Sequence, residues 1–132
     1  MIGVRWFAAL LALAAPSLAV AQCDAPGAKV ESDRLVVIYR TVPPKIAVGQ
    51  HFAVEARVCA KGAGAAPTAL RVDADMPAHR HGMNYRATVS PKGDGRYVAE
   101  GLLFHMPGQW RLLFDVDGGG RTERLAANLT LE

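Results

Sequence analysis

The chain has little cysteine, little net charge and no second long apolar run. Charged residues make up only 20% of its 132 positions, and the formal net charge is +3, which is too weak and too dispersed for a nucleic-acid-binding surface. Beyond residue 21 no stretch reaches the ~20 apolar residues that a membrane-spanning helix needs. Internal repeats, low-complexity tracts and a second domain are also missing from the sequence. We therefore expect one domain that is not embedded in a membrane and binds no nucleic acid.

The usual catalytic constellations are missing as well. No catalytic carboxylate, cysteine nucleophile or glycine-rich phosphate loop stands out. The H-x-H of His79 and His81 would suit a copper/zinc superoxide dismutase, but four histidines are too few for a copper site and a bridged zinc site. A blue-copper carrier needs His and Met soon after its Cys ligand, and Cys59 is followed by AKG. We expect a protein that is not an enzyme.

Residues 1–21 have the pattern of an export signal. Arg5 supplies a positive start, an apolar run covers 6–13, and the small-x-small sequence of 19–21 suits signal peptidase. The run is too short for a retained membrane anchor, and the residue before Cys23 is Gln22 rather than the small residue that lipidation requires. Cleavage after residue 21 would leave residues 22–132 as one domain in the periplasm or secreted.

Cys23 and Cys59 are the chain's two cysteines. In an oxidising compartment an even count favours a disulfide. Metal binding through these thiols is the alternative, but neither cysteine belongs to a C-x-x-C pair or has a histidine close by in sequence. We expect a Cys23–Cys59 bridge.

Apolar and polar residues alternate with period two between turn-rich breaks, and no segment shows helical periodicity. This pattern predicts seven strands, at 34–41, 52–59, 68–76, 83–90, 96–104, 110–117 and 122–131. Seven short, evenly spaced antiparallel strands are typical of an all-β, immunoglobulin-like β-sandwich, with a small barrel as the alternative.

Histidine and methionine fall together in this scheme. If successive strands alternate in direction, the connections after the first, third and fifth strands emerge at one end of the sandwich. All four histidines and all three methionines beyond residue 1 map to that end: His51, Met76, His79, His81, Met83, His105 and Met106. The opposite end carries ordinary Gly, Pro, Lys and Asp turn residues.

A mixed set of imidazoles and thioethers favours copper. Imidazole binds several transition metals, whereas thioether is a soft ligand that selects Cu(I). More ordinary roles stay open: Met76 and Met83 as flexible fillers of the core, His79 and His81 as solvated loop residues, His105 as a partner of a backbone carbonyl. His51, far from the others in sequence, is expected to be a bystander.

Several motifs resemble the YtkA-like domain family. They are I-x-V-G-x-x-F at 46–52, M-P-x-H-x-H-G-M at 76–83, G-x-Y at 95–97 and F-x-M-P-G-x-W at 104–110. The resemblance covers about residues 34–131. It implies an exported or membrane-anchored immunoglobulin-like sandwich, similar in architecture to CopC-type copper carriers. It also implies a copper-linked role for six residues: Met76, His79, His81, Met83, His105 and Met106.

Two functions follow as hypotheses. The first is an accessory protein that holds copper at the His/Met end and passes it to a membrane or periplasmic protein partner. The second is a metal-free interaction module that uses the same end, with methionines and Trp110 forming an apolar surface. Convergence of the imidazoles on one point favours the first, and inward packing of the methionines favours the second.

Overall fold

The computed structural model describes residues 23–132, which form nine β-strands and one 3₁₀ turn. The predicted export signal at 1–21 lies outside the described residues. The elements in chain order are β1 (Ala28–Glu31), β2 (Leu35–Val42), β3 (His51–Ala60), β4 (Ala69–Met76), η1 (Pro77–His79), β5 (His81–Gly82), β6 (Thr88–Gly93), β7 (Arg96–Leu103), β8 (Gly108–Gly118) and β9 (Arg121–Leu131). No helix in this part of the chain is long and apolar enough to cross a bilayer.

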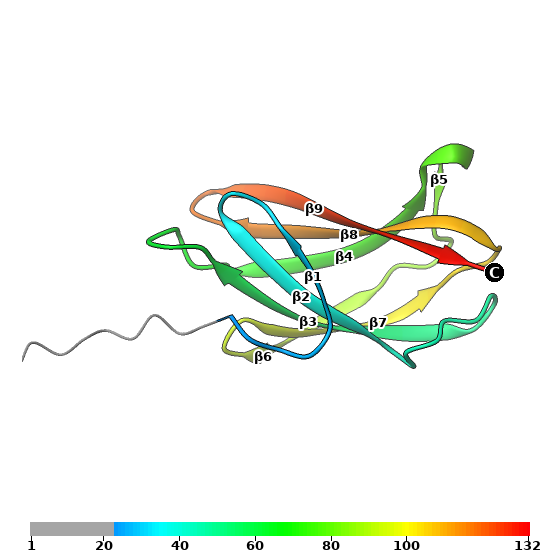
Figure 1. Ribbon diagram of the computed structural model, residues 1–132, viewed down its shortest axis with the longest axis horizontal. Coiled ribbons are helices and arrows are strands. Elements are labelled where there is room, and N and C mark those ends of the chain that lie inside the picture. Colours follow the sequence, from blue (N-terminus) through cyan, green and yellow to red (C-terminus); the bar gives the residue numbers. More distant parts are fainter. Residues whose placement is uncertain (1–22) are drawn as a thin grey trace, which may run out of the picture.

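The strands form two antiparallel sheets that pack face to face (Figure 1). One sheet has the order β1-β2-β3-β7-β6 and the other the order β5-β4-β8-β9. Every strand pair is antiparallel. The predicted immunoglobulin-like β-sandwich is therefore confirmed.

Alternating burial shows why these segments become strands. In β8 the side chains of Trp110, Leu112, Phe114 and Val116 are all buried, as the period-two pattern predicted. The facing sheet contributes side chains that are equally buried, including Val37, Val54, Ala99 and Leu102. Since the six longer strands, β2, β3, β4, β7, β8 and β9, bury their apolar faces, the two sheets enclose a single hydrophobic core.

Seven strands were expected, and residues 23–132 form nine. The short β1 was missed; it precedes the first predicted strand and pairs with β2. The strand predicted at 83–90 is wrong in its first half. The chain leaves the four-stranded sheet after β5, which pairs with β4, and joins the five-stranded sheet at β6, which pairs with β7. Residues 83–87 cross between the layers and make no ladder, although their apolar alternation resembles that of a strand.

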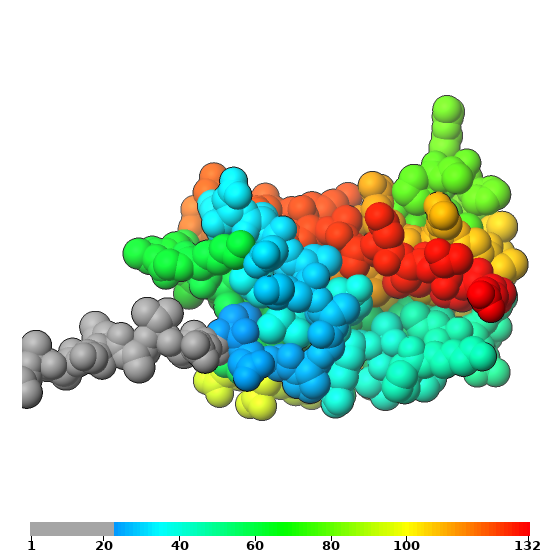
Figure 2. Space-filling view, viewed as in Figure 1, coloured from blue at the N-terminus to red at the C-terminus, as the bar shows by residue number. Residues whose placement is uncertain are grey.

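The connections group at the two ends as the alternation of strand direction predicted. The β2–β3, β4–β5 and β7–β8 connections lie at the end that also holds the C-terminus, at the right of Figure 1. We call this the histidine end, because residues 51, 79, 81 and 105 lie on these connections or at the strand ends that border them. The segment around η1 and β5 stands out from the body of the protein (Figure 2).

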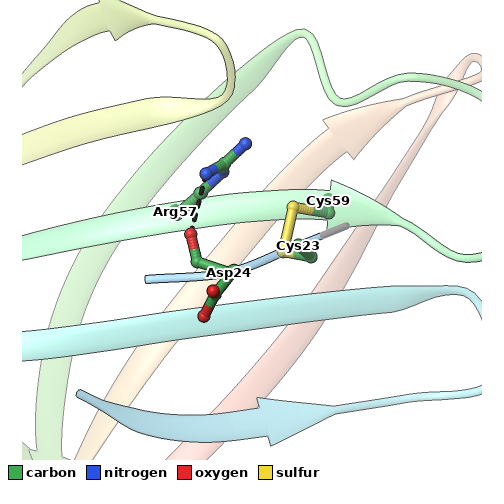
Figure 3. Close-up of a disulfide and its surroundings, with 4 residues drawn as sticks. All are labelled: Cys23, Asp24, Arg57 and Cys59. Atoms are coloured by element: carbon green, nitrogen blue, oxygen red, sulfur yellow. Dashed lines mark hydrogen bonds between the residues drawn. A yellow bond between two sulfur atoms is a disulfide. The ribbon is translucent and has the colours of Figure 1, made fainter. Parts of the chain in front are cut away.

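The expected disulfide is present between Cys23 and Cys59, with an S–S distance of 2.02 Å. The Cys59 side chain points outward from β3, where the N-terminal arm, residues 23–27, reaches it (Figure 3). Arg57, on the same outward face of β3, donates from Nη1 to the carbonyl oxygen of Asp24 at 2.7 Å. The bridge and this hydrogen bond hold the arm against the five-stranded sheet.

Ion pairs cover the outer face of the four-stranded sheet. Arg111 binds Asp75 with two hydrogen bonds of 2.9 and 2.7 Å, and Arg124 binds Asp115 with two of 2.7 and 2.8 Å. Arg71 binds Asp117 in the same paired way. The hydrogen bonds from Arg124 lower the pKa of Asp115, although its partial burial opposes them.

Backbone crowding at Gly95 gives the first prediction. Gly95 lies in the β6–β7 turn at φ +70°, and a Cβ there would lie 2.4 Å from the Val58 carbonyl oxygen. Gly120, in the β8–β9 turn at φ +76°, would have no atom within 4 Å of its Cβ. Gly95→Ala should therefore lower the free energy of unfolding by more than ~2 kcal/mol, and Gly120→Ala by only ~1 kcal/mol, the cost of the left-handed backbone alone. Urea denaturation measures both, and equal losses would contradict the prediction.

The lowered pKa of Asp115 gives a prediction about acid. The folded-state pKa lies below the unfolded value of ~3.9, so the ionised carboxylate stabilises the fold above about pH 4, and this stabilisation is lost as the pH falls through the folded-state pKa. Asp115→Asn should cost roughly 0.5 to 1 kcal/mol at pH 7, because Arg124 is half exposed, and almost nothing near pH 2. Urea denaturation across this pH range tests it. Asp33→Asn, at an exposed carboxylate, serves as the control for the loss of one negative charge.

Candidate functional site

The turn after β4 brings two distant segments together at the histidine end. Pro77 begins η1, and Arg80 ends it in the left-handed conformation, with φ +55° and its N–H donating to the Pro77 carbonyl oxygen. The chain then reverses so that His81 pairs with Met76 across the β4–β5 ladder. This reversal returns His81 to the edge of the sheet, beside the connection that follows β7.

Three imidazole rings form a row there. The ring centre of His81 lies 5.7 Å from that of His79 and 5.1 Å from that of His105. His79 is exposed, whereas His81 and His105 are partly buried. The structure therefore brings together three of the predicted site residues from two separate loops, and we call them the histidine row.

Two ring nitrogens in the row have distinct surroundings. Nδ1 of His81 lies 3.1 Å from the carbonyl oxygen of Gly82 and donates to it, because a carbonyl can only accept. In neutral His81 this contact leaves the lone pair on Nε2. Nδ1 of His105 is buried and has no hydrogen-bond partner among residues 23–132. A buried nitrogen without a partner is costly, so its presence needs an explanation.

Trp110 lies against the row from the core side. Its ring is stacked on Phe104 at 4.3 Å, and its Nε1 donates to the Met106 carbonyl oxygen at 3.0 Å. Its ring centre lies 6.0 Å from that of His81 and 5.4 Å from that of His105, both in edge-on geometry. Trp110 was expected in the apolar surface of the metal-free alternative, but it is only 1% exposed, and its contact with the imidazoles was not foreseen. The one indication of this contact in the sequence was that Trp110 stands in the same F-x-M-P-G-x-W motif as His105.

The three methionines lie on the core side of this end. Met76 is only 1% exposed, and its Cε would lie 2.9 Å from a Cβ placed on Gly108, so its side chain fills the space beneath the β7–β8 connection. Met83 and Met106 are partly buried and pack against the core. Met76 therefore fills the core, which was the role expected for it besides metal binding. A metal role for the three thioethers stays a prediction.

His51 lies apart from the row. It begins β3 at the same end, and its ring makes an edge-on contact with Tyr85 at 5.2 Å. Tyr85 is 47% exposed on the segment that crosses between the sheets. His51 and Tyr85 therefore form a separate surface pair.

The row can supply a small number of neutral nitrogen ligands. Among residues 23–132, no three His, Cys, Asp or Glu side chains are arranged to hold one metal ion. Two imidazoles that share an ion at about 2.0 Å from each nitrogen have ring centres on the order of 5 to 6 Å apart, and the spacings within the row fall in this range. The spacing of the imidazoles therefore fits a site of two nitrogen ligands.

Comparison with known proteins places the chain in a family. Neither the curated proteins nor the solved structures include a match to it. The YtkA-like family matches residues 29–114, well over half of the chain, and the matched range contains the histidine row and all three methionines. The resemblance seen in the sequence is thereby confirmed. The chain belongs to the YtkA-like family.

Proposed function

We propose that this protein is an exported accessory protein that binds copper at the histidine row and passes it to a protein partner. An exported accessory role is consistent with membership of the YtkA-like family. The place of action is the periplasm or the extracellular space, and the partner is a membrane or periplasmic protein. The protein itself catalyses no reaction in this proposal.

The unpartnered Nδ1 of His105 carries the proposal. It is buried beside His81, whose own Nδ1 proton is engaged by the Gly82 carbonyl oxygen. Histidines that bind metals commonly donate their second ring nitrogen to a backbone carbonyl in this way, which sets the tautomer and orients the ring. A metal ion bound between Nε2 of His81 and Nδ1 of His105 would satisfy both imidazoles.

The neighbouring sulfur atoms favour copper over zinc. Met106 follows His105 directly in the chain and is only partly buried where it packs against the core, so it is the candidate thioether ligand of the proposed site. Thioethers select Cu(I), and Cys23 and Cys59 are unavailable as thiolates because they form a disulfide. His and Met are then the soft and borderline ligands that remain.

Transfer to a partner requires ligands that another protein can reach. His79 is exposed on the segment that protrudes from the sandwich (Figure 2), and its ring is 5.7 Å from that of His81. An exposed imidazole next to a partly buried one provides an entry and exit ligand for the ion. The protruding segment is also the part of this end that a partner would meet first.

A Cu(I) titration under a competing chelator tests the proposal. We expect one Cu(I) per chain, with quenching of Trp110 fluorescence because its ring is within ~6 Å of both imidazoles. His81→Ala/His105→Ala should weaken binding by at least about a hundredfold, because the loss of each ligand costs about tenfold, or ~1.4 kcal/mol. His51→Ala, at the same end but outside the row, should bind within about twofold of the parent. Unchanged binding by the double variant would contradict the proposal.

A second variant tests the choice of metal. Met106→Leu keeps the apolar bulk and removes the sulfur, so it should weaken Cu(I) binding while leaving Zn²⁺ binding unaffected. Equal effects on the two ions would argue against a thioether ligand.

The burial of the methionines favours a second candidate, a metal-free interaction module at the same end. Met76 fills the core, and Met83 and Met106 pack against it, which leaves the exposed Pro77–His79 turn and Arg80 as the protein-binding surface. Failure of the folded parent protein to bind Cu(I) in the same titration would support this candidate and exclude the copper carrier.

A further inference from the structure

The outer face of the five-stranded sheet contains a hollow that is separate from the histidine row. It lies where the N-terminal arm crosses this face, and its volume is about 330 Å³, within the range of small-molecule sites. Ala25 and Pro26 of the arm form one wall, and Ile38 and Val98 contribute the apolar floor. Ile38 belongs to the outward set of β2, yet it is only 7% exposed.

Positive charge surrounds this apolar floor. Four cationic side chains line the hollow against a single carboxylate, Glu55: they are Arg40, Arg57, Lys92 and Arg96. Glu55 is already paired with Arg40, with a hydrogen bond of 2.6 Å from Nε. Arg96 Nη2 lies 3.8 Å from the exposed carboxylate of Asp94, and Arg57 and Lys92 have no ion-pair partner among residues 23–132. By contrast, the arginines on the outer face of the opposite sheet are matched with aspartates. The excess of cations is therefore local to the hollow and favours an anion there.

Arg57 has unused hydrogen-bonding capacity at this place. Of its five N–H donors, the hydrogen bond from Nη1 to the Asp24 carbonyl oxygen is the one that the structure shows, and the buried Nε has no partner within residues 23–132. Figure 3 shows its guanidinium extending from β3 beyond the arm. A planar guanidinium with free donors suits a carboxylate, which accepts two parallel hydrogen bonds.

We propose that this hollow binds a small amphiphilic organic anion, a carboxylate with an apolar chain or ring. The apolar part lies on Ile38 and Val98 and under Pro26, and the carboxylate pairs with Arg57 and Arg96. Burial of the apolar part and charge-assisted hydrogen bonds at the rim act together, as in other ligand sites of this size.

The disulfide holds in place the N-terminal arm, which forms one wall of the hollow. Cys59 lies two residues after Arg57 on the outward face of β3, and its bond to Cys23 holds the arm that carries Ala25 and Pro26. Without the bridge, the hydrogen bond from the Arg57 side chain to the Asp24 carbonyl oxygen is what still ties this part of the arm to β3. Anion binding in this site is therefore stronger in the oxidised protein than in the reduced one.

Titration of the purified protein with decanoate, below its micelle concentration, tests the proposal by calorimetry. Displacement of the fluorescent anion 1-anilinonaphthalene-8-sulfonate gives a second readout. We expect saturable binding of one decanoate per chain and at least about tenfold weaker binding of decanol, which lacks the charge. Arg57→Gln/Arg96→Gln should weaken decanoate binding about tenfold or more. Arg71→Gln/Arg124→Gln, the same charge change on the opposite face, should change it by less than about twofold.

Two further variants test the apolar space of the hollow and the wall formed by the arm, each without changing the cationic side chains. Val98→Trp fills the hollow without altering the charge and should abolish binding, and Cys23→Ser/Cys59→Ser should weaken it, with melting curves confirming that each variant folds. Equal losses in the two arginine pairs, or no saturable binding by the parent, would overturn the proposal. Binding to phosphatidylglycerol vesicles without binding of free decanoate would overturn it in favour of a membrane surface.

Discussion

The burial of Trp110 at one end of the core is the interaction on which the arrangement of the histidine end depends. Its indole stacks on Phe104, which follows β7, while its own strand β8 belongs to the opposite sheet, so this contact joins the two layers at the histidine end. The indole N–H also binds the Met106 carbonyl oxygen and thereby orients the β7–β8 connection. Because His81 and His105 both rest against the edges of this ring, the core of the sandwich sets the position of the imidazoles.

The crossing between the sheets provides the second constraint. β5 has only two residues and pairs with the end of β4, after which the chain passes to the other layer and begins β6. This short pairing turns His81 back toward the β7–β8 connection, since the β4–β5 ladder sets it opposite Met76. A regular strand from 83 onward would have extended the hairpin instead. The irregular segment is therefore part of how the histidine row is assembled.

The two outer faces of the sandwich differ in charge although the chain is nearly balanced as a whole. On the four-stranded sheet, cross-strand neighbours alternate in sign, and Arg71, Arg111 and Arg124 each bind an aspartate. On the five-stranded sheet the arm brings apolar residues over a surface rimmed by cations. The net charge of +3 does not reveal this difference between the two faces. The difference arises from strand register and from the path of the arm rather than from composition.

Much of the fold could be predicted from particular residues. The alternation in β8 predicted its buried face, and the two cysteines of a chain expected in an oxidising compartment predicted the bridge between Cys23 and Cys59. Six of the seven predicted strands match observed ones to within about two residues, the usual uncertainty at element ends. The four residues of β1 were missed because so short a segment shows too little alternation of apolar and polar residues to be recognised as a strand. The crossing at 83–87 was mistaken for a strand because local alternation does not reveal which sheet a residue joins.

The sequence by itself determined the sandwich, the disulfide and the gathering of histidines and methionines at one end, because period-two burial and strand alternation are properties of the chain order. Only the tertiary structure decided which of those side chains meet. It placed His79, His81 and His105 in one row, put Met76 in the core and separated His51 with Tyr85. The same holds for the cationic hollow, whose lining comes from the arm and four strands. Such contacts depend on how two sheets and their loops pack in space, which no local pattern in the sequence encodes.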